Sequence, residues 1–391
     1  MRVRVAGFVL LALAICGCSG KRSADPTSLR VLTDLSAREN NFGVILDAKT
    51  GKALTAFRLN NPIRAAIPDG NGGWYIGGGF IHVNGVLRKR LAHIDRNGRL
   101  DPDWRPEANG NGVSVTSLAR IGSRIYVAGD FARLDHSPRL WIGAVDAATG
   151  KLLGWRSPHA AVNYPVLLAG ANRVYVGGYG VTSRSGLIAL QPDGRPDPAW
   201  HAQVDTSNIE GGSVRILVFR RGRLYFAGMF GKVDGSSSAG IASVAAYDGR
   251  LLARWRPPLR ARYCVACTDV GAMAIGGTHV FAGTSRAIVA LDPLTGAIEP
   301  GFRTQVGLRE GIHGGSWINS MERARKRLYL AGSFDRVDGA RRLGVAAIDA
   351  ATGRVVDSWT AAASQASGSV VAASGSRILV GIQLRRAVPS G

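Results

Sequence analysis

The side chains best suited to chemistry lie in variable segments between more regular, apolar stretches. These segments span 105–113, 156–165, 201–213, 256–270, 303–317 and 360–368. Histidine exchanges protons near neutral pH, and the forked guanidinium of arginine suits carboxylate, sulfate and phosphate groups. We therefore predict that these segments form one binding face. Its candidate residues are Glu107, His159, His201, Glu210, Arg256, Arg260, Arg262, Arg303, Arg309, His313 and Trp317.

The histidines of these segments, His159, His201 and His313, are far apart in the sequence and share no spacing typical of metal ligands. A general base must also lie within hydrogen-bond reach of the proton that it removes, and separate segments do not ensure this. The segments therefore predict recognition, with no metal site, no catalytic residue and no cofactor.

The balance of charge favours acidic partners. The chain has 49 lysine and arginine residues against 27 aspartate and glutamate residues, which gives a formal net charge of +22. Such a charge attracts polyanions. Because the chain begins with an export signal, described below, nucleic acid is not an expected partner. We expect a monomer that binds an envelope protein or an anionic glycan or other polymer.

Two cysteines lie close together in one variable segment, as Cys264-Val265-Ala266-Cys267. Two cysteines are too few for a structural zinc site with four cysteine or histidine ligands. Disulfides form and persist outside the cytoplasm. We therefore predict a local disulfide between Cys264 and Cys267. A redox role is the alternative, although no thioredoxin-like βαβ pattern surrounds the pair.

The N-terminus has the organisation of a secretory signal. Arg2 and Arg4 precede an apolar run from Val5 to Ile15. A run of this length is typical of a signal peptide and too short to span a membrane.

The segment Ile15-Cys16-Gly17-Cys18 resembles the bacterial lipobox. The resemblance implies that residues 1–17 are a lipoprotein signal peptide and that Cys18 is lipidated, for example with palmitate. Residues 18–41 are then a flexible tether. An ordinary signal peptide with incidental cysteines is the alternative. We expect a lipid-anchored protein of the cell envelope, exposed outside the cytoplasm in the periplasm, at the outer membrane or on the cell surface.

A repeated motif accounts for the regular stretches. An aromatic or aliphatic residue is followed by a further apolar residue and then by small residues that include glycine. Its first residues are Tyr75, Tyr126, Tyr175, Tyr225, Phe281, Tyr329 and Leu379, so that successive copies lie 51, 49, 50, 56, 48 and 50 residues apart.

A second motif ends each repeat with an apolar pair, in most copies an aspartate, a turn containing glycine, and an aromatic residue. The aromatic residues are Phe57, Trp104, Trp155, Trp200, Trp255, Phe302 and Trp359. We interpret the aspartates as turn residues and the aromatics as contacts between neighbouring repeats. Phe57 precedes the first opening motif, and Leu379 has no closing motif after it. Strands from about 44–57 are therefore expected beside strands from about 369–384.

Repeats of about 50 residues with strand-length apolar runs are typical of four-stranded propeller blades. The pattern predicts an all-β protein whose residues 42–391 form a single seven-bladed β-propeller. The N-terminal strands would complete the C-terminal blade and close the ring.

Two stretches resemble known repeats of bacterial propellers. Residues 334–339 and 80–85 look like the delta-60 repeat, and residues 347–359 are similar to the quinoprotein-type, or PQQ-like, repeat. The resemblance covers nearly all of 42–385 and implies the fold. Propellers host unrelated functions. We interpret the chain as a lipid-anchored binding scaffold. The alternative is an enzyme at the channel mouth, either a quinone-dependent dehydrogenase or a glycan hydrolase or lyase.

Overall fold

The structure is a computed structural model that describes residues 41–110, 112–156, 163–179, 186–206, 212–259, 270–307, 317–361 and 366–384. Within these ranges every regular element is a β-strand, and the paired strands run antiparallel. The same part of the chain contains no helix long and apolar enough to cross a membrane. The prediction of an all-β protein is confirmed.

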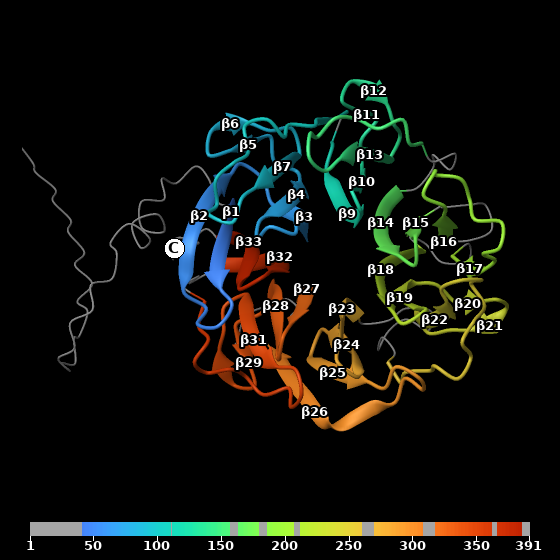
Figure 1. Cartoon of the computed structure of the whole chain (residues 1–391). Helices are drawn as coiled ribbons and strands as arrows, with labels where there is room; N and C mark the ends of the chain where they lie inside the picture. Colours follow the sequence, from blue (N-terminus) through green and yellow to red (C-terminus); the bar gives the residue numbers. More distant parts are fainter. Residues whose placement is uncertain are drawn as a thin grey trace, which may run out of the picture.

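Small sheets surround a common centre, as Figure 1 shows. The strands nearest the centre are β3 (Ile63–Pro68), β9 (Val115–Ile121), β14 (Asn163–Gly170), β18 (Ser213–Arg220), β23 (Val270–Gly276), β27 (Trp317–Ala324) and β32 (Ala366–Ser374). Each contacts the corresponding strand of the next sheet, and β32 contacts both β27 and β3. The described chain therefore has a propeller-like fold.

The second and third strands of the sheets form most of the core. The second strands are β4 (Trp74–Gly78), β10 (Arg124–Gly129), β15 (Arg173–Tyr179), β19 (Arg223–Met229), β24 (His279–Thr284), β28 (Arg327–Ser333) and β33 (Arg377–Leu384). The third strands are β7 (Leu91–Ile94), β13 (Ile142–Asp146), β16 (Leu187–Leu190), β22 (Ile241–Ala245), β25 (Ala287–Leu291), β31 (Val345–Asp349) and β1 (Asn41–Asp47). These strands read as nearly continuous apolar runs because neighbouring sheets cover both of their faces.

The outer strands are β2 (Ala53–Leu59), β8 (Ala108–Asn109), β17 (Val204–Asp205) and β26 (Ile298–Gly307). Four short hairpins extend these outer strands: β5 (His82–Val83) with β6 (Val86–Leu87), β11 (Arg133–Leu134) with β12 (Ser137–Pro138), β20 (Lys232–Val233) with β21 (Ser236–Ser237), and β29 (Arg336–Val337) with β30 (Ala340–Arg341). Each hairpin lies in sequence between the second and third strands of one repeat, but it pairs with the outer strand of the preceding repeat.

An aspartate or asparagine at the tip of each hairpin makes this connection. Asn84, Asp135, Asp234 and Asp338 have positive φ angles between 45° and 50°, a conformation that Asn and Asp tolerate better than most residues. Their side-chain oxygens accept hydrogen bonds from the backbone amides of Arg58, Glu107, Gln203 and Gln305, over 2.7 or 2.8 Å. The delta-60-like motif thus joins neighbouring sheets.

The two ends of the described chain lie in one sheet. Strand β1 pairs with β33 without interruption, from Asn41 opposite Gln383 to Asp47 opposite Arg377. Strand β2 continues the same sheet beyond β1, in the order β32-β33-β1-β2. A β-strand from the N-terminal part of the chain therefore covers the edge that β33 would otherwise expose.

The closing aromatic residues pack one sheet on the next, as predicted. Trp104 is 1% exposed, and its ring centroid lies 5.0 Å from that of Tyr75. The Tyr75 hydroxyl donates to the carbonyl oxygen of Ala147 in the following sheet over 2.6 Å. Tyr225 repeats the arrangement, with Trp255 at 5.0 Å and a 2.8 Å hydrogen bond to Pro293.

The aspartates of the closing motif hold turns, which confirms that prediction. Asp349 is typical: its Oδ1 accepts hydrogen bonds from the amides of Ala351 and Thr352 and from the Thr352 hydroxyl. Burial alone would raise the pKa of Asp349, but these hydrogen bonds lower it overall.

Candidate functional site

The structure describes five of the eleven residues predicted for the binding face: Glu107, His201, Arg256, Arg303 and Trp317. The other predicted residues lie outside the described ranges: His159, Glu210, Arg260, Arg262, Arg309 and His313. Cys18, predicted to carry the lipid, and the predicted Cys264–Cys267 disulfide also lie outside them.

Three predicted residues occupy one repeat position. His201, Arg256 and Arg303 each follow a closing aromatic residue, and all three are exposed. The sequence places Arg303 in a connecting segment. The structure instead continues the outer strand β26 to Gly307, with Arg303 opposite Val289. Arg303 therefore lies in an outer strand, whereas His201 and Arg256 lie in segments without regular secondary structure.

Glu107 stabilises the edge of its sheet. Its Oε2 lies 2.8 Å from the Lys89 ammonium and 3.7 Å from His136 Nε2. The hydrogen bond from Lys89 is the largest cause that lowers the pKa of Glu107, which keeps the carboxylate ionised. Its backbone amide donates to Asp135. The carboxylate and the amide of Glu107 therefore already make contacts within the protein.

Trp317 lies in a different place, at the start of the inner strand β27, with 49% of its surface exposed. Each inner strand contains a β-bulge close to this end. A bulge re-aims the side chain of the extra residue. The extra residues in five of these strands are polar: Arg64, Thr116, Arg215, Asn319 and Ser369.

The bulge residues form a polar set that the sequence prediction missed. Arg64, Arg215 and Asn319 are exposed. The Thr116 hydroxyl donates to Pro165 over 3.1 Å, and the Asn319 amide donates to Gly368 over 2.8 Å, each across to the next inner strand. The glycines of the second strands are a signal in the sequence for these bulges. Gly332, for example, lies opposite the bulge of β27, where a Cβ would collide with the Trp317 carbonyl oxygen.

A titratable cluster that the sequence prediction also missed surrounds His93. Its Nδ1 lies 2.8 Å from Asp101 Oδ2 and its Nε2 lies 3.0 Å from Asp69 Oδ2, so that only the imidazolium can donate to both carboxylates. Burial alone would raise the pKa of Asp69 and of Asp101, but hydrogen bonds from His93 and from backbone amides lower both. The ring stacks on Tyr75 at 4.6 Å. Both nitrogens are occupied, so the cluster supports the fold.

One inner strand carries an acidic residue where the others carry apolar ones. Glu322 in β27 lies opposite Tyr329, and burial raises its pKa to about 7. The corresponding residues, assigned by their partners in the second strands, are Ile67, Ala119, Leu168, Val218, Ala274 and Ala372. Three of these, Ile67, Ala119 and Leu168, line an apolar hollow of about 590 Å³.

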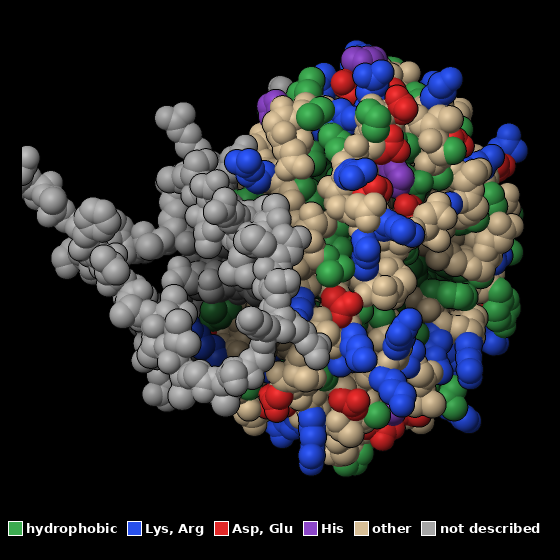
Figure 2. All heavy atoms as spheres, turned by 60° about the vertical axis from the view of Figure 1, so that its left-hand side comes forward, with side chains coloured by type: hydrophobic (Ala, Val, Ile, Leu, Met, Phe, Trp, Pro, Cys, Tyr) green, Lys and Arg blue, Asp and Glu red, His purple; other side chains and the backbone are tan. Residues whose placement is uncertain are grey.

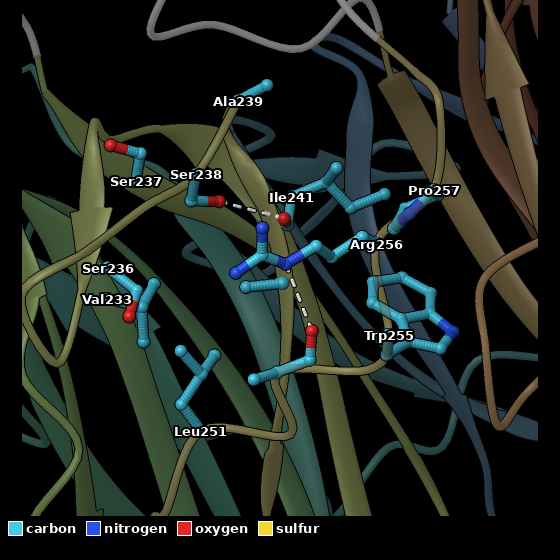
Figure 3. A pocket seen from close by; sticks show the side chains of 12 residues that line it. Val233, Ser236, Ser237, Ser238, Ala239, Ile241, Leu251, Trp255, Arg256 and Pro257 are labelled. Atoms are coloured by element: carbon cyan, nitrogen blue, oxygen red, sulfur yellow. Dashed lines mark hydrogen bonds between the residues drawn. The ribbon is translucent and has the colours of Figure 1, made fainter.

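Two further hollows flank the hairpins at the outer edge. One, of about 470 Å³, is lined by Arg286, Arg303 and Arg336 together with Asp338. The other, of about 120 Å³, lies between the β20–β21 hairpin and the segment that includes Trp255 and Arg256 (Figure 3). Figure 2 shows Lys and Arg side chains dispersed over the visible face among fewer acidic ones. Arginines at such hollows suit anionic groups.

The described surface offers side chains suited to recognition. Among the described residues, no group of three or more His, Cys, Asp and Glu side chains could hold a metal ion. Exposed arginines, the exposed Trp317 and polar bulge residues lie on a strand framework, and arginine and tryptophan are enriched among the residues that dominate binding interfaces.

Comparison with known proteins places this framework among propellers. Residues 138–381 match the sequence family described as outer membrane protein assembly factor BamB, and residues 70–103 match a β-propeller domain of unknown function. These matches confirm the predicted resemblance to bacterial propeller repeats. No curated protein is significantly similar in sequence.

Several solved structures are similar in fold. BamB from Moraxella catarrhalis is 15% identical over 87% of this chain and 91% of that chain, with a TM-score of 0.46. The extracellular domain of a hybrid two component system from B. thetaiotaomicron is 13% identical over 90% of this chain and 40% of that chain, with a TM-score of 0.50. The WD40 β-propeller domain of Doa1 is 12% identical over 88% of this chain and 98% of that chain, with a TM-score of 0.49.

Proposed function

Because the chain belongs to the family described as outer membrane protein assembly factor BamB, we propose that it is a protein-binding scaffold of the cell envelope. The family match over residues 138–381 is the observation that carries this proposal. The surfaces described above support it, since they offer arginines and an exposed aromatic residue for recognition.

We infer that the scaffold is a closed ring of seven blades. The pairing of β1 with β33 supports this inference, and so do the contacts of β32 with both β27 and β3. In this arrangement residues 42–391 are one propeller, and β1 and β2 complete the blade that begins with β32 and β33. A closed ring leaves no open sheet edge and keeps the binding residues in fixed positions.

The proposal includes a lipid anchor at Cys18. After removal of residues 1–17, the diacyl or triacyl terminus typical of lipoproteins would hold the protein on a membrane, because stable anchoring takes more than one acyl chain. Residues 18–41 would then tether a monomeric propeller outside the cytoplasm. The partner is an envelope protein, and the excess of basic residues would also admit an anionic glycan or polymer.

The partner is expected at the face where the inner strands begin. Trp317 and the bulge residues Arg64, Arg215 and Asn319 lie there and are exposed. Leu294, which is 58% exposed, lies in the turn after β25 and therefore at the opposite end of the blade. The two positions provide a matched pair, because both are exposed apolar side chains on one framework.

Site-specific photo-crosslinking in the native envelope tests the proposal. A photoreactive phenylalanine analogue replaces Trp317 in one strain and Leu294 in another, and adducts are identified by mass spectrometry. We expect a discrete protein adduct from position 317 only. The same experiment with Cys18→Ser should release the protein from the membrane and reduce the adduct. Equal adducts from both positions, or none from position 317, would contradict the proposed face and role.

A further inference from the structure

The β20–β21 hairpin departs from the other three at one residue. Arg88, Arg139, Arg342 and Ser238 occupy the same place at the end of their hairpins. Their backbone amides make the same hydrogen bond back across the hairpin, to Ile81, Ala132, Asp335 and Gly231 respectively, over 2.8 to 3.0 Å. Three hairpins therefore carry an arginine at this position, and one carries a serine.

In the arginine-containing hairpins the side chain fills the space behind the hairpin. Arg88 and Arg139 are each 7% exposed. Arg88 donates to the carbonyl oxygens of Asp101 and Pro102 over 2.9 and 3.1 Å, and Arg139 donates to that of Leu153 over 3.4 Å. These arginines therefore bind the hairpin to the segment that precedes the closing tryptophan.

Ser238 is too short to fill the corresponding space. Its hydroxyl donates to the Ile241 carbonyl oxygen over 2.9 Å. A hollow of about 120 Å³ remains, with Ser236, Ser237 and Trp255 among its lining residues. This volume holds several water molecules or one small polar group.

Arg256 makes the contact that the missing arginine would make. Its Nε donates over 3.0 Å to the carbonyl oxygen of Ala253. Ala253 lies two residues before Trp255, just as Leu153 lies two residues before Trp155. Figure 3 shows the Arg256 guanidinium directed between the serines and Trp255. Its terminal amino groups have no partner among the residues that the structure describes.

The other hairpins show why this position is electrostatically distinct. Arg105 and Arg156 follow their closing tryptophans as Arg256 does. Burial is the main cause that lowers the pKa of Arg88, and the positive charge of Arg105 lowers it further. Burial and Arg156 lower the pKa of Arg139 in the same way. Each of those arginines therefore has a second positive charge near it. The Ser238 hollow has the guanidinium of Arg256 and room beside it.

We propose that the hollow between the β20–β21 hairpin and Arg256 binds a single carboxylate group. The guanidinium fork matches the two carboxylate oxygens, and Ser236 lines the hollow beside it. This inference rests on the proposed scaffold function. It specifies the group that a partner presents to this hollow, the side chain of an aspartate or glutamate. A free carboxylate offers the same chemistry.

Amide spectra of the full-length protein, labelled with ¹⁵N-serine, test the site at constant ionic strength. The probes are acetate, a glycine–glutamate–glycine peptide blocked at both ends, and its glutamine counterpart. We expect saturable shifts at Ser236–Ser238 with acetate and the glutamate peptide, and none with the glutamine peptide. Tighter binding of the glutamate peptide than of acetate would identify a protein side chain as the source, and equal binding would identify a free carboxylate.

Two variants provide the decisive controls. Ser238→Arg copies the other hairpins and should fold, fill the hollow and weaken binding about tenfold or more, as should Arg256→Gln. Ser238→Ala keeps the hollow and should retain binding. Equal responses from the wild type and Ser238→Arg, or no saturable response in the wild type, would overturn the proposal. Because the probes are small and the protein is purified, neither result would alter the crosslinking test of the scaffold function.

Discussion

Residues 213–256 and residues 317–360 fold into two units with the same order of strands, although their side chains differ at most positions. Ser213 begins β18 as Trp317 begins β27, so that corresponding residues are 104 positions apart throughout. Both units keep the closing tryptophan, and both keep an aspartate at the hairpin tip. These are the residues that join one sheet to the next.

The two units differ at positions that the architecture does not require. Glu322 in one unit corresponds to Val218 in the other, and Arg342 corresponds to Ser238. The backbone pairing is the same at both places. The repeat therefore sets the framework, while single substitutions within it create a partly buried acid in one unit and an open hollow in the other. Exchanging these residues between the units tests that distinction.

The largest effect on the free energy of unfolding is expected for Glu322→Val, which gives this unit the valine of the other unit. Because burial raises the pKa of Glu322 to about 7 from an ordinary value of 4.5, the folded state binds its proton more tightly than the unfolded state. The stabilisation is complete below about pH 4.5 and is lost as the pH rises through about 7. Glu322→Val should thus gain about 2–3 kcal/mol in unfolding free energy between pH 4.5 and pH 8, relative to the wild type.

Urea unfolding at a series of pH values measures this difference. Glu322→Gln is the matched control, since it removes the titration while it keeps the shape and polarity of the side chain. Parallel pH profiles for the wild type and both variants would show that Glu322 is ionised freely in the folded protein.

A smaller effect on the free energy of unfolding is expected at the hairpin aspartates, and it should be larger at Asp234 than at Asp338. Asp234 accepts hydrogen bonds from the amides of Gln203 and Leu251, over 2.8 and 3.1 Å. Asp338 accepts the equivalent hydrogen bond from the amide of Gln305 over 2.7 Å. We expect Asp234→Ala to cost about 2 kcal/mol and Asp338→Ala about 1 kcal/mol. Denaturant midpoints of the two variants give the comparison, and Asp338→Asn should be nearly neutral because Asn84 holds the same position naturally.

The smallest effect on stability is expected for Arg342→Ser, which gives the second unit the serine of the first. Arg342 donates to the Arg341 carbonyl oxygen over 2.9 Å and to Asp357 over 3.4 Å. Since the Asp357 side chain is 90% exposed, this ion pair contributes little. We expect a loss of about 1 kcal/mol or less in unfolding free energy. No gain of acetate binding is expected, because Thr360 stands where the first unit has Arg256; a gain would show that an open hollow alone suffices.

The sequence predicted the framework well because the residues that build it recur. An aromatic residue after a glycine turn, and an aromatic or aliphatic residue shortly before a glycine, mark the sheets and their contacts in successive copies. The bulge residues were missed because a bulge adds one residue to a strand without changing its composition. Arg303 was assigned to a connecting segment because the sequence pattern ends the repeat at the closing aromatic Phe302, whereas β26 continues past it and pairs Arg303 with Val289. The serine at position 238 was detectable, since aligning the four hairpins by their Asn or Asp residues sets it against three arginines.

The pairing of β1 with β33 also constrains the order in which the molecule can form. Residues 41–47 must wait for residues 377–383 before that pairing exists. Loop closure over such a separation is slow, and contacts of high sequence separation delay folding. Strand β1 can pair with β2 as soon as both have emerged, but its other edge is among the last to be covered. Until then this edge is open to a chaperone or to another copy of the chain.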